Sequence, residues 1–164
     1  MRDLIGVERL AALFNKVRDM LKRQNVIREV FTFVDATQLI SKISTWEERD
    51  KAIKQGLEKF NNATAGLVGR DKEARFGCKG KNKFWYGYKK NVSVDMTHGF
   101  ISRVAVKPAN VPDHKGLKHV CPRQGAVFGD KGYSPGESRD EIKRRGCHSS
   151  VILKDNMSGK NRDK

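Results

Sequence analysis

Two aspartates stand where strand-like segments of the sequence end. Asp35 follows the run VFTFV at residues 30–34, and Asp130 closes the run AVFGD at residues 126–130. Both runs are short and apolar, which is typical of strands buried on both faces. Folding alone does not require a carboxylate beside such a strand, because burying an unpaired one is costly. Both aspartates are therefore candidates for a chemical role.

If the two strands are neighbours, Asp35 and Asp130 converge and repel each other. A divalent cation would relieve that repulsion, because carboxylate oxygens are its preferred ligands. Two Mg²⁺ ions about 3.5–4 Å apart would stabilise the attacking and leaving oxygens of a phosphodiester displacement. The alternative is that each aspartate only caps the turn after its strand. Spacing alone leaves both interpretations open.

Basic and aromatic residues interleave further along the chain, where the lysines are Lys79, Lys81, Lys83, Lys89 and Lys90 and the aromatic residues are Phe84, Trp85, Tyr86 and Tyr88. Lysines neutralise a nucleic-acid backbone, and exposed aromatic rings stack on bases. The alternative places the aromatic rings in the sheet core and the lysines on a solvated edge. We expect a mixture, with the aromatic rings in the core and the five lysines on DNA.

The whole composition favours a polyanionic partner. The 164 residues include 34 Lys and Arg against 19 Asp and Glu, a net charge of +15. Residues 1–70 carry a net +4 and residues 71–164 a net +11, so the second part should bind the polyanion. Nucleic acid is the commonest such partner, and an anionic membrane surface is the next.

Several other classes are excluded by the sequence. No segment has the roughly 18–20 consecutive apolar residues of a membrane span, and the first residues lack a signal-peptide core, so we expect a cytoplasmic protein without a membrane partner. The three cysteines form no CxxC pair, which argues against a disulfide framework and a zinc ribbon. The length suits one domain with its own core.

The first half of the chain contains one strong helical pattern. Apolar residues spaced by three and four predict a helix over residues 4–24. The run at 30–34 predicts a strand, and Thr45 with Glu48 forms a capping-box pattern that predicts a helix to about residue 60. Residues 61–83 are rich in glycine and charge and predict a loop.

The second half predicts alternating strands and helices. Residues 84–95 and 100–107 form a hairpin that two prolines end, and a short helix follows over 113–120. The strand at 126–130 precedes a helix that Ser134 caps and Gly146 ends, and 149–154 form a last strand. This order predicts an α/β fold with a mixed sheet and flanking helices.

Several motifs occur in the order seen in the DDE transposases of bacterial insertion sequences, and the chain resembles that family from about residue 10 to residue 155. They are FVDATQL, RDKEARFG, GYK with VSVDMTHGFI, PANVPDHK and FGDKGYSP. The resemblance implies an RNase H-like mixed sheet preceded by an N-terminal helix. We accordingly expect a helical segment over 1–28, an RNase H-like core over 29–155 and a basic polar tail over 156–164.

The same resemblance implies DNA binding and Mg²⁺-dependent (or Mn²⁺-dependent) strand cleavage and transfer in transposition. Asp35 and Asp130 match the first two catalytic acids and would ligate the metal, while Lys131 and Tyr133 would lie beside the DNA backbone. The implied partner is double-stranded DNA at transposon ends, in a nucleoid-associated location. A homo-oligomer is left open.

One element of the family pattern has no counterpart here, so a third acid is assigned to no residue. The family's glutamate lies in a segment resembling R…VE after the last strand, and the sequence reaches Lys164 without one. We therefore expect a C-terminally truncated chain that is inactive in isolation. The alternative function is that of a catalytically inactive DNA-binding fragment from a decayed or split insertion element.

Overall fold

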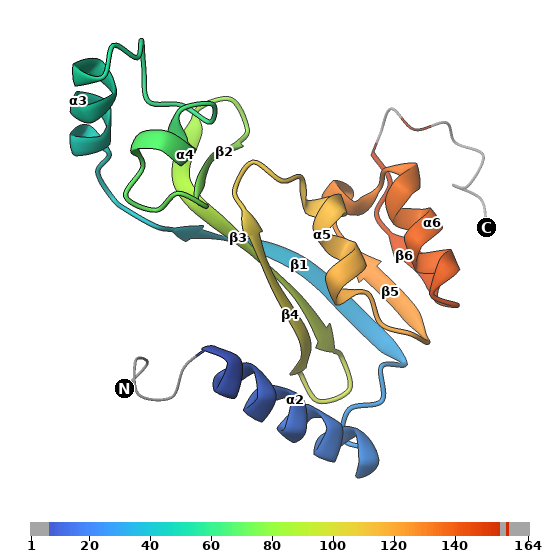
Figure 1. The fold of residues 1–164 in the computed structure, drawn as a ribbon. Coiled ribbons are helices and arrows are strands. Elements are labelled where there is room, and N and C mark those ends of the chain that lie inside the picture. The colour runs from blue at the N-terminus through green and yellow to red at the C-terminus, as the bar shows by residue number, and fades with distance from the viewer. Residues whose placement is uncertain (1–6, 155–156, 158–164) are drawn as a thin grey trace.

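The computed structural model describes residues 7–154 and residue 157; most of the expected basic tail lies outside them. The chain forms a mixed sheet with flanking helices, which confirms the predicted fold class (Figure 1). The helices are α2 (Val7–Arg23), α3 (Trp46–Lys54), α4 (Ala65–Val68), α5 (Asp113–Val120) and α6 (Gly136–Arg144). The strands are β1 (Phe31–Ile40), β2 (Arg75–Lys79), β3 (Lys83–Asp95), β4 (Phe100–Pro108), β5 (Ala126–Gly129) and β6 (His148–Val151).

Strand β1 lies at the centre of the sheet. It pairs antiparallel with β3 and parallel with β5, and β5 pairs parallel with β6. The long strand β3 also pairs with β2 through residues 83–87 and with β4 through residues 88–95. The predicted hairpin is confirmed. The strands at 30–34 and 126–130 are neighbours, which is the condition under which Asp35 and Asp130 were expected to converge.

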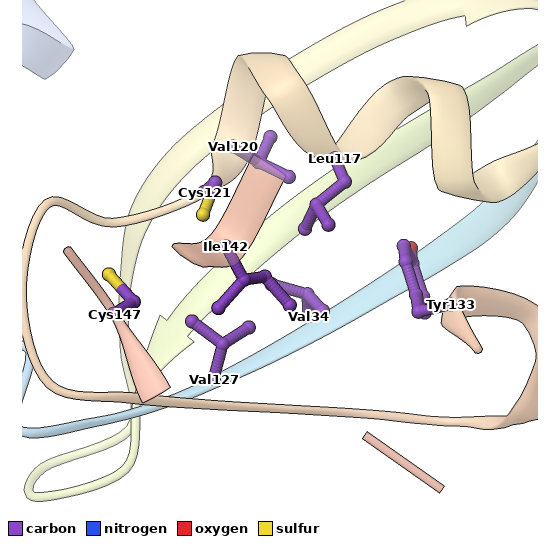
Figure 2. Close-up of a cluster of buried hydrophobic side chains, with 8 residues drawn as sticks. All are labelled: Val34, Leu117, Val120, Cys121, Val127, Tyr133, Ile142 and Cys147. Carbon is purple, nitrogen blue, oxygen red and sulfur yellow. The ribbon is translucent and has the colours of Figure 1, made fainter. Parts of the chain in front are cut away.

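Helices α5 and α6 cover one face of the sheet. Figure 2 shows the core between them, where Val34 and Val127 from the sheet meet Leu117, Val120 and Ile142 from the helices. Burying these side chains stabilises the sheet and fixes the ends of β1 and β5 relative to α5.

The opposite face of β1 is open in the described part of the chain. Phe31 is 51% exposed and Phe33 41% exposed, whereas Thr32 and Val34, which alternate with them, are buried. The expectation of burial on both faces was therefore wrong for residues 30–34. Side chains alternate along a strand, and the described helices α5 and α6 cover only the face of Val34.

Strand β1 also continues past Asp35 to Ile40. Asp35 lies opposite Val92, and the ladder with β3 runs on to the pair of Ile40 and Gly87. The expected position of Asp35 at a strand end was wrong, because the long partner β3 extends the pairing. Asp130, by contrast, directly follows β5 as expected.

The segment between β1 and β3 is more ordered than predicted. Helix α3 ends at Lys54, and the Thr45 side chain makes no capping hydrogen bond. Glu48 pairs with Lys42 at 3.0 Å. The expected loop contains α4 and β2, and within it Ala65 and Ala74 pack against Tyr86. Tertiary packing therefore gave structure to a stretch of weak local propensity.

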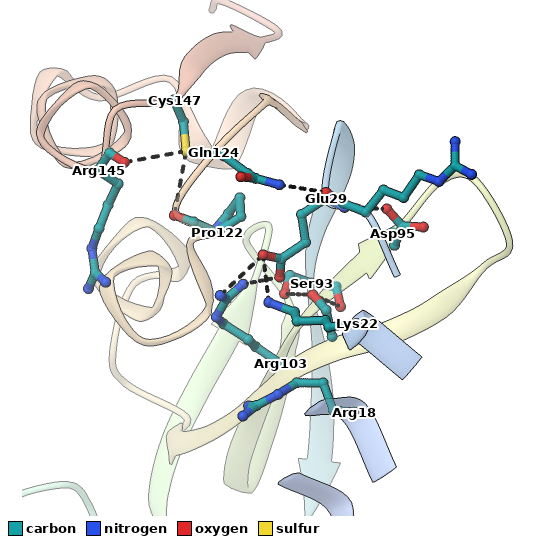
Figure 3. A network of polar contacts seen from close by, with 12 residues as sticks. Arg18, Lys22, Glu29, Ser93, Asp95, Arg103, Pro122, Gln124, Arg145 and Cys147 are labelled. Carbon is teal, nitrogen blue, oxygen red and sulfur yellow. Dashed lines mark hydrogen bonds and ion pairs between the residues drawn. The ribbon is translucent and has the colours of Figure 1, made fainter. Parts of the chain in front are cut away.

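Helix α2 confirms the predicted N-terminal helix over its described part and contacts the core through a partly buried ion-pair network (Figure 3). Glu29 follows the helix and is almost fully buried, and Lys22 Nζ lies 2.8 Å from its Oε2. Arg103 of β4 donates to the same carboxylate, and the Glu29 N–H donates to Asp95 Oδ1 at 2.8 Å. These contacts hold Glu29 at a φ of 52°, a conformation that is costly for a residue other than glycine.

The last elements lie close to their predicted positions, but the strand expected over 149–154 is β6, which ends at Val151, and one cap differs. Helix α6 begins at Gly136 without a side-chain cap, because the Ser134 hydroxyl donates to the Lys131 carbonyl instead. All three cysteines are free.

Candidate active site

The two predicted aspartates line one cleft of about 470 Å³. Three of the five predicted lysines line it as well, and the full lining is Asp35, Ala36, Thr37, Gln38, Cys78, Lys79, Lys83, Trp85, Lys89, Asp113 and Asp130. The sheet makes this possible, because β1 and β5 are parallel neighbours and β2 and β3 extend beyond them. Carboxylates and ammonium groups thus share one surface.

Asp130 lies in the turn that leaves β5. Its side chain accepts a hydrogen bond of 2.9 Å from the Gly132 N–H, which caps the short 3-10 helix Lys131–Tyr133. The turn-capping interpretation therefore applies to this aspartate. One bond to Oδ1 fixes the carboxylate and leaves Oδ2 available to a ligand.

Asp35 lies in the middle of β1, on the row of Phe31 and Phe33 that faces away from α5. It is exposed, and within residues 7–154 its carboxylate has no hydrogen-bond or ion-pair partner. The structure thus gives this aspartate no capping role.

A third carboxylate, missed by the sequence analysis, lies in the same cleft. Asp113 begins α5, and its Oδ1 forms an ion pair of 2.8 Å with Lys89 Nζ. A Cβ added to Gly132 would lie 2.9 Å from Asp130 Oδ1 and 3.6 Å from Asp113 Oδ2, so both carboxylates approach the same glycine. The only sequence signal was an acid that opens a helix within PANVPDHK.

Tyr133 belongs to the buried hydrophobic cluster rather than to the surface (Figure 2). It is 1% exposed, and its hydroxyl has no hydrogen-bond partner among the described residues. Burial raises the pKa of Tyr133 far above its usual value, and the charges of Asp113, Asp35 and Asp130 raise that pKa further. The ring is therefore a neutral phenol inside the protein, which conflicts with its expected contact to a DNA backbone.

The remaining lysines are spread more widely. Lys89 also donates to the Val111 carbonyl at 3.1 Å, so its ammonium is fixed in the cleft. Lys81 is exposed in the turn between β2 and β3, Lys90 lies in β3, and Lys131 is exposed beside Asp130, all outside the lining of the cleft.

The expectation for the four aromatic residues is correct in part. Trp85 and Tyr86 are buried, and the Tyr88 hydroxyl donates to Asp71 at 2.7 Å. Phe84 is 68% exposed and does not belong to the core.

The donor types at this cleft fit a hard divalent cation, because the acids contribute oxygen ligands and Asp35 is unengaged. However, in the described part of the chain no three His, Cys, Asp or Glu side chains lie close enough together to hold a metal ion. The residues present thus suit a metal in chemistry without forming a closed cage.

Comparison with known families decides what kind of protein this is. The family model described as "Transposase DDE domain" matches residues 41–163, three quarters of the chain. The chain belongs to the DDE transposase family. The match includes Asp113, Asp130 and the lysines, and it begins just after β1, so Asp35 lies outside it.

Membership of this DDE transposase family points to a role in transposition and implies nuclease or transferase chemistry with divalent metals. A search of curated proteins found no match. No helix among the described residues is long and apolar enough to cross a membrane.

Proposed function

We propose that the protein binds double-stranded DNA at transposon ends and takes part in Mg²⁺-dependent strand cleavage and transfer. The observation that supports this proposal is the cleft in which Asp35 and Asp130 lie with Lys79, Lys83 and Lys89. Phosphodiester displacement needs both features, carboxylates that hold a cation and cations that hold the backbone. The nucleoid is the expected location.

Each group in the cleft has a separate task in this proposal. Asp35 and Asp130 hold the cation, which when bound activates water or a 3′-hydroxyl and stabilises the leaving oxygen. The cleft lysines neutralise phosphates on either side of the scissile bond. The exposed Lys81 and Lys131 and the half-buried Lys90 extend that contact. Tyr133 belongs to the wall of the site and is no longer assigned to DNA.

A second candidate function is DNA binding without catalysis. It is favoured by the finding that no three potential metal ligands come together in the described residues. A protein of this kind would occupy transposon ends or pair with an active transposase. It would need the lysines of the cleft for DNA binding but not the carboxylates.

Two measurements separate these functions. The first is Mn²⁺ binding by the full chain, with Asp35→Asn and Asp130→Asn as variants and Asp140→Asn, an exposed acid of α6, as control. We expect each site variant to bind Mn²⁺ about tenfold or more weakly and the control to bind normally. Unchanged titrations for both site variants would remove the proposed metal site.

The second measurement is nicking of a supercoiled plasmid that carries the cognate ends, with Mg²⁺ or Mn²⁺. Specific nicking that Asp130→Asn abolishes supports the catalytic function. End-specific binding without nicking supports the second candidate.

A further inference from the structure

A second cavity lies at the opposite end of the central strands from the candidate active site. It measures about 470 Å³ and lies between the end of α2, the residues before β1, strand β4 and the loop that leads into β5. Val30 and Gln124 line it shortly before β1 and β5 begin, whereas Asp35 lies further along β1 and Asp130 follows β5. At about 3.3 Å per residue, Val30 and Asp35 are roughly 17 Å apart along the strand. One phosphate therefore cannot contact both sites.

Positive charge dominates the lining of this cavity, which we call the basic pocket. Its charged residues are one acid, Glu29, and four cations, Lys22, Arg28, Arg103 and Arg123. Figure 3 shows that Lys22 and Arg103 both point at the buried Glu29 carboxylate, which they share. Arg28 and Arg123 are exposed, and among the described residues neither pairs with a carboxylate. The pocket thus has an excess of positive charge that an anion would balance.

The two segments that carry the exposed arginines are joined to each other. The Arg28 Nε donates to the Asn25 carbonyl at 3.0 Å, and Gln124 Nε2 donates to the Arg28 carbonyl at 2.8 Å. The approach of the two segments requires Gly125, which has a φ of 78°, because a Cβ there would lie 2.2 Å from the Glu29 carbonyl oxygen. The backbone therefore keeps both arginines at one cavity.

We propose that the basic pocket binds a backbone phosphate of duplex DNA, at a site separate from the candidate active site. Arg28 and Arg123 donate to the phosphate oxygens, because the planar guanidinium group matches the geometry of a phosphate. Lys22 and Arg103 remain on Glu29 and add to the positive potential. The inference takes the identity of the polyanion from the proposed function, but its site shares no residue with the cleft of Asp35 and Asp130.

The phosphate belongs either to the duplex that occupies the cleft or to a second duplex. Phosphates advance about 3.4 Å per base pair along the duplex axis, so a single duplex needs about five base pairs to span the distance between the two sites. The contact has the same chemistry in both cases. Stoichiometry separates them, because a second duplex gives two duplexes per chain for the wild type and one for a variant without the basic pocket.

The test is fluorescence anisotropy of the full chain with a duplex of about 30 base pairs across a salt series. We expect the double variant Arg28→Gln and Arg123→Gln to reduce the magnitude of the salt slope by about 1–2, because each lost phosphate contact removes about 0.9. The control pair Arg9→Gln and Arg49→Gln changes two exposed arginines outside both cavities and should alter the slope by less than about 0.5. Thermal unfolding checks that each variant folds.

A second readout locates the contact. Phenylglyoxal modifies accessible guanidinium groups, and we expect bound DNA to protect Arg28 and Arg123 from it, as measured by mass spectrometry of the peptides. Modification of both arginines at the rate of the free protein would overturn the inference, and so would equal salt slopes for the double variant and the control pair.

Failure of the proposed function would look different. If the variant Lys79→Gln, Lys83→Gln and Lys89→Gln leaves DNA binding unchanged while the arginine double variant weakens it, DNA does not enter the cleft and the basic pocket stands. If the lysine variant weakens binding and the arginine double variant does not, the cleft stands and the basic pocket is not a phosphate site.

Discussion

At the scale of single residues, the position of Asp130 depends on a glycine two residues later. A Cβ on Gly132 would lie 2.9 Å from Asp130 Oδ1, closer than real Cβ contacts, so the carboxylate must move. We expect Gly132→Ala to weaken Mn²⁺ binding about tenfold without changing any ligand. Gly136→Ala is the matched control, because a Cβ there meets no atom within 4 Å. Equal titrations for the two alanine variants would contradict the arrangement.

Glu29 provides the residue-scale prediction for stability. Burial raises the pKa of Glu29, but the hydrogen bonds from Lys22 and Arg103 outweigh burial and hold that pKa below its usual 4.5. The ion pairs therefore stabilise the fold above about pH 4.5, and this contribution is lost as the pH falls through the lowered pKa.

The corresponding variant is Glu29→Gln. It removes the negative charge that Lys22 and Arg103 share, so we expect a loss of about 3 kcal/mol in the free energy of unfolding at pH 7. The loss should shrink as the pH falls through the lowered pKa of Glu29, because the wild-type carboxyl is then itself protonated. Urea unfolding at several pH values measures this, with Glu58→Gln, an exposed acid, as control. A loss independent of pH would show that the network contributes packing rather than charge.

At the scale of elements, the sequence predicted those helices and strands whose own residues carry a periodic pattern. Such a pattern is present in helix α2, in the hairpin of β3 and β4, and in the segment from α5 to β6. The extension of β1 past Asp35 and the strand β2 do not, because each needs β3 as a partner. The open face of β1 was missed for a related reason, since a run such as VFTFV does not say which faces helices will cover.

The residues of the candidate site also fall into those that the sequence predicted and those that it did not. Asp35 and Asp130 could be found from their place beside strand-like runs, and the lysines from their density. Asp113 and Tyr133 could not, because their role depends on α5 and the turn after β5 meeting at Gly132. The burial of Tyr133 in particular is a property of the assembled core.

The segment between β1 and β3 offers a prediction at this scale. Asp71 accepts hydrogen bonds from the Tyr88 hydroxyl at 2.7 Å and the Ser41 hydroxyl at 2.8 Å, and from two backbone N–H groups. At about 1 kcal/mol each, their loss in Asp71→Ala should cost at least about 2 kcal/mol. Hydrogen exchange should quicken over residues 41–79 and not over α5. Asp50→Ala, at an exposed position of α3, is the control. If hydrogen exchange quickened equally over residues 41–79 and α5, the segment would not unfold separately from the rest of the chain.

At the scale of the whole molecule, the net charge of +15 acts through its distribution. Most of the excess lies after residue 70, and three of those lysines line the cleft with the carboxylates. A general positive field would attract DNA in any orientation. Lysines fixed at the cleft direct the backbone toward Asp35 and Asp130, so their removal should affect binding more than removal of equal charge elsewhere.

Salt dependence measures that difference. Each phosphate contact adds about −0.9 to the slope of log affinity against log salt concentration. The triple variant Lys79→Gln, Lys83→Gln and Lys89→Gln should therefore reduce the magnitude of the slope by about 2–3. The control triple Lys16→Gln, Lys54→Gln and Lys59→Gln removes the same charge from exposed positions outside the cleft and should change the slope by less than about 1. Fluorescence anisotropy with one duplex across a salt series measures both, and equal slopes for the two triple variants would mean that DNA does not enter the cleft.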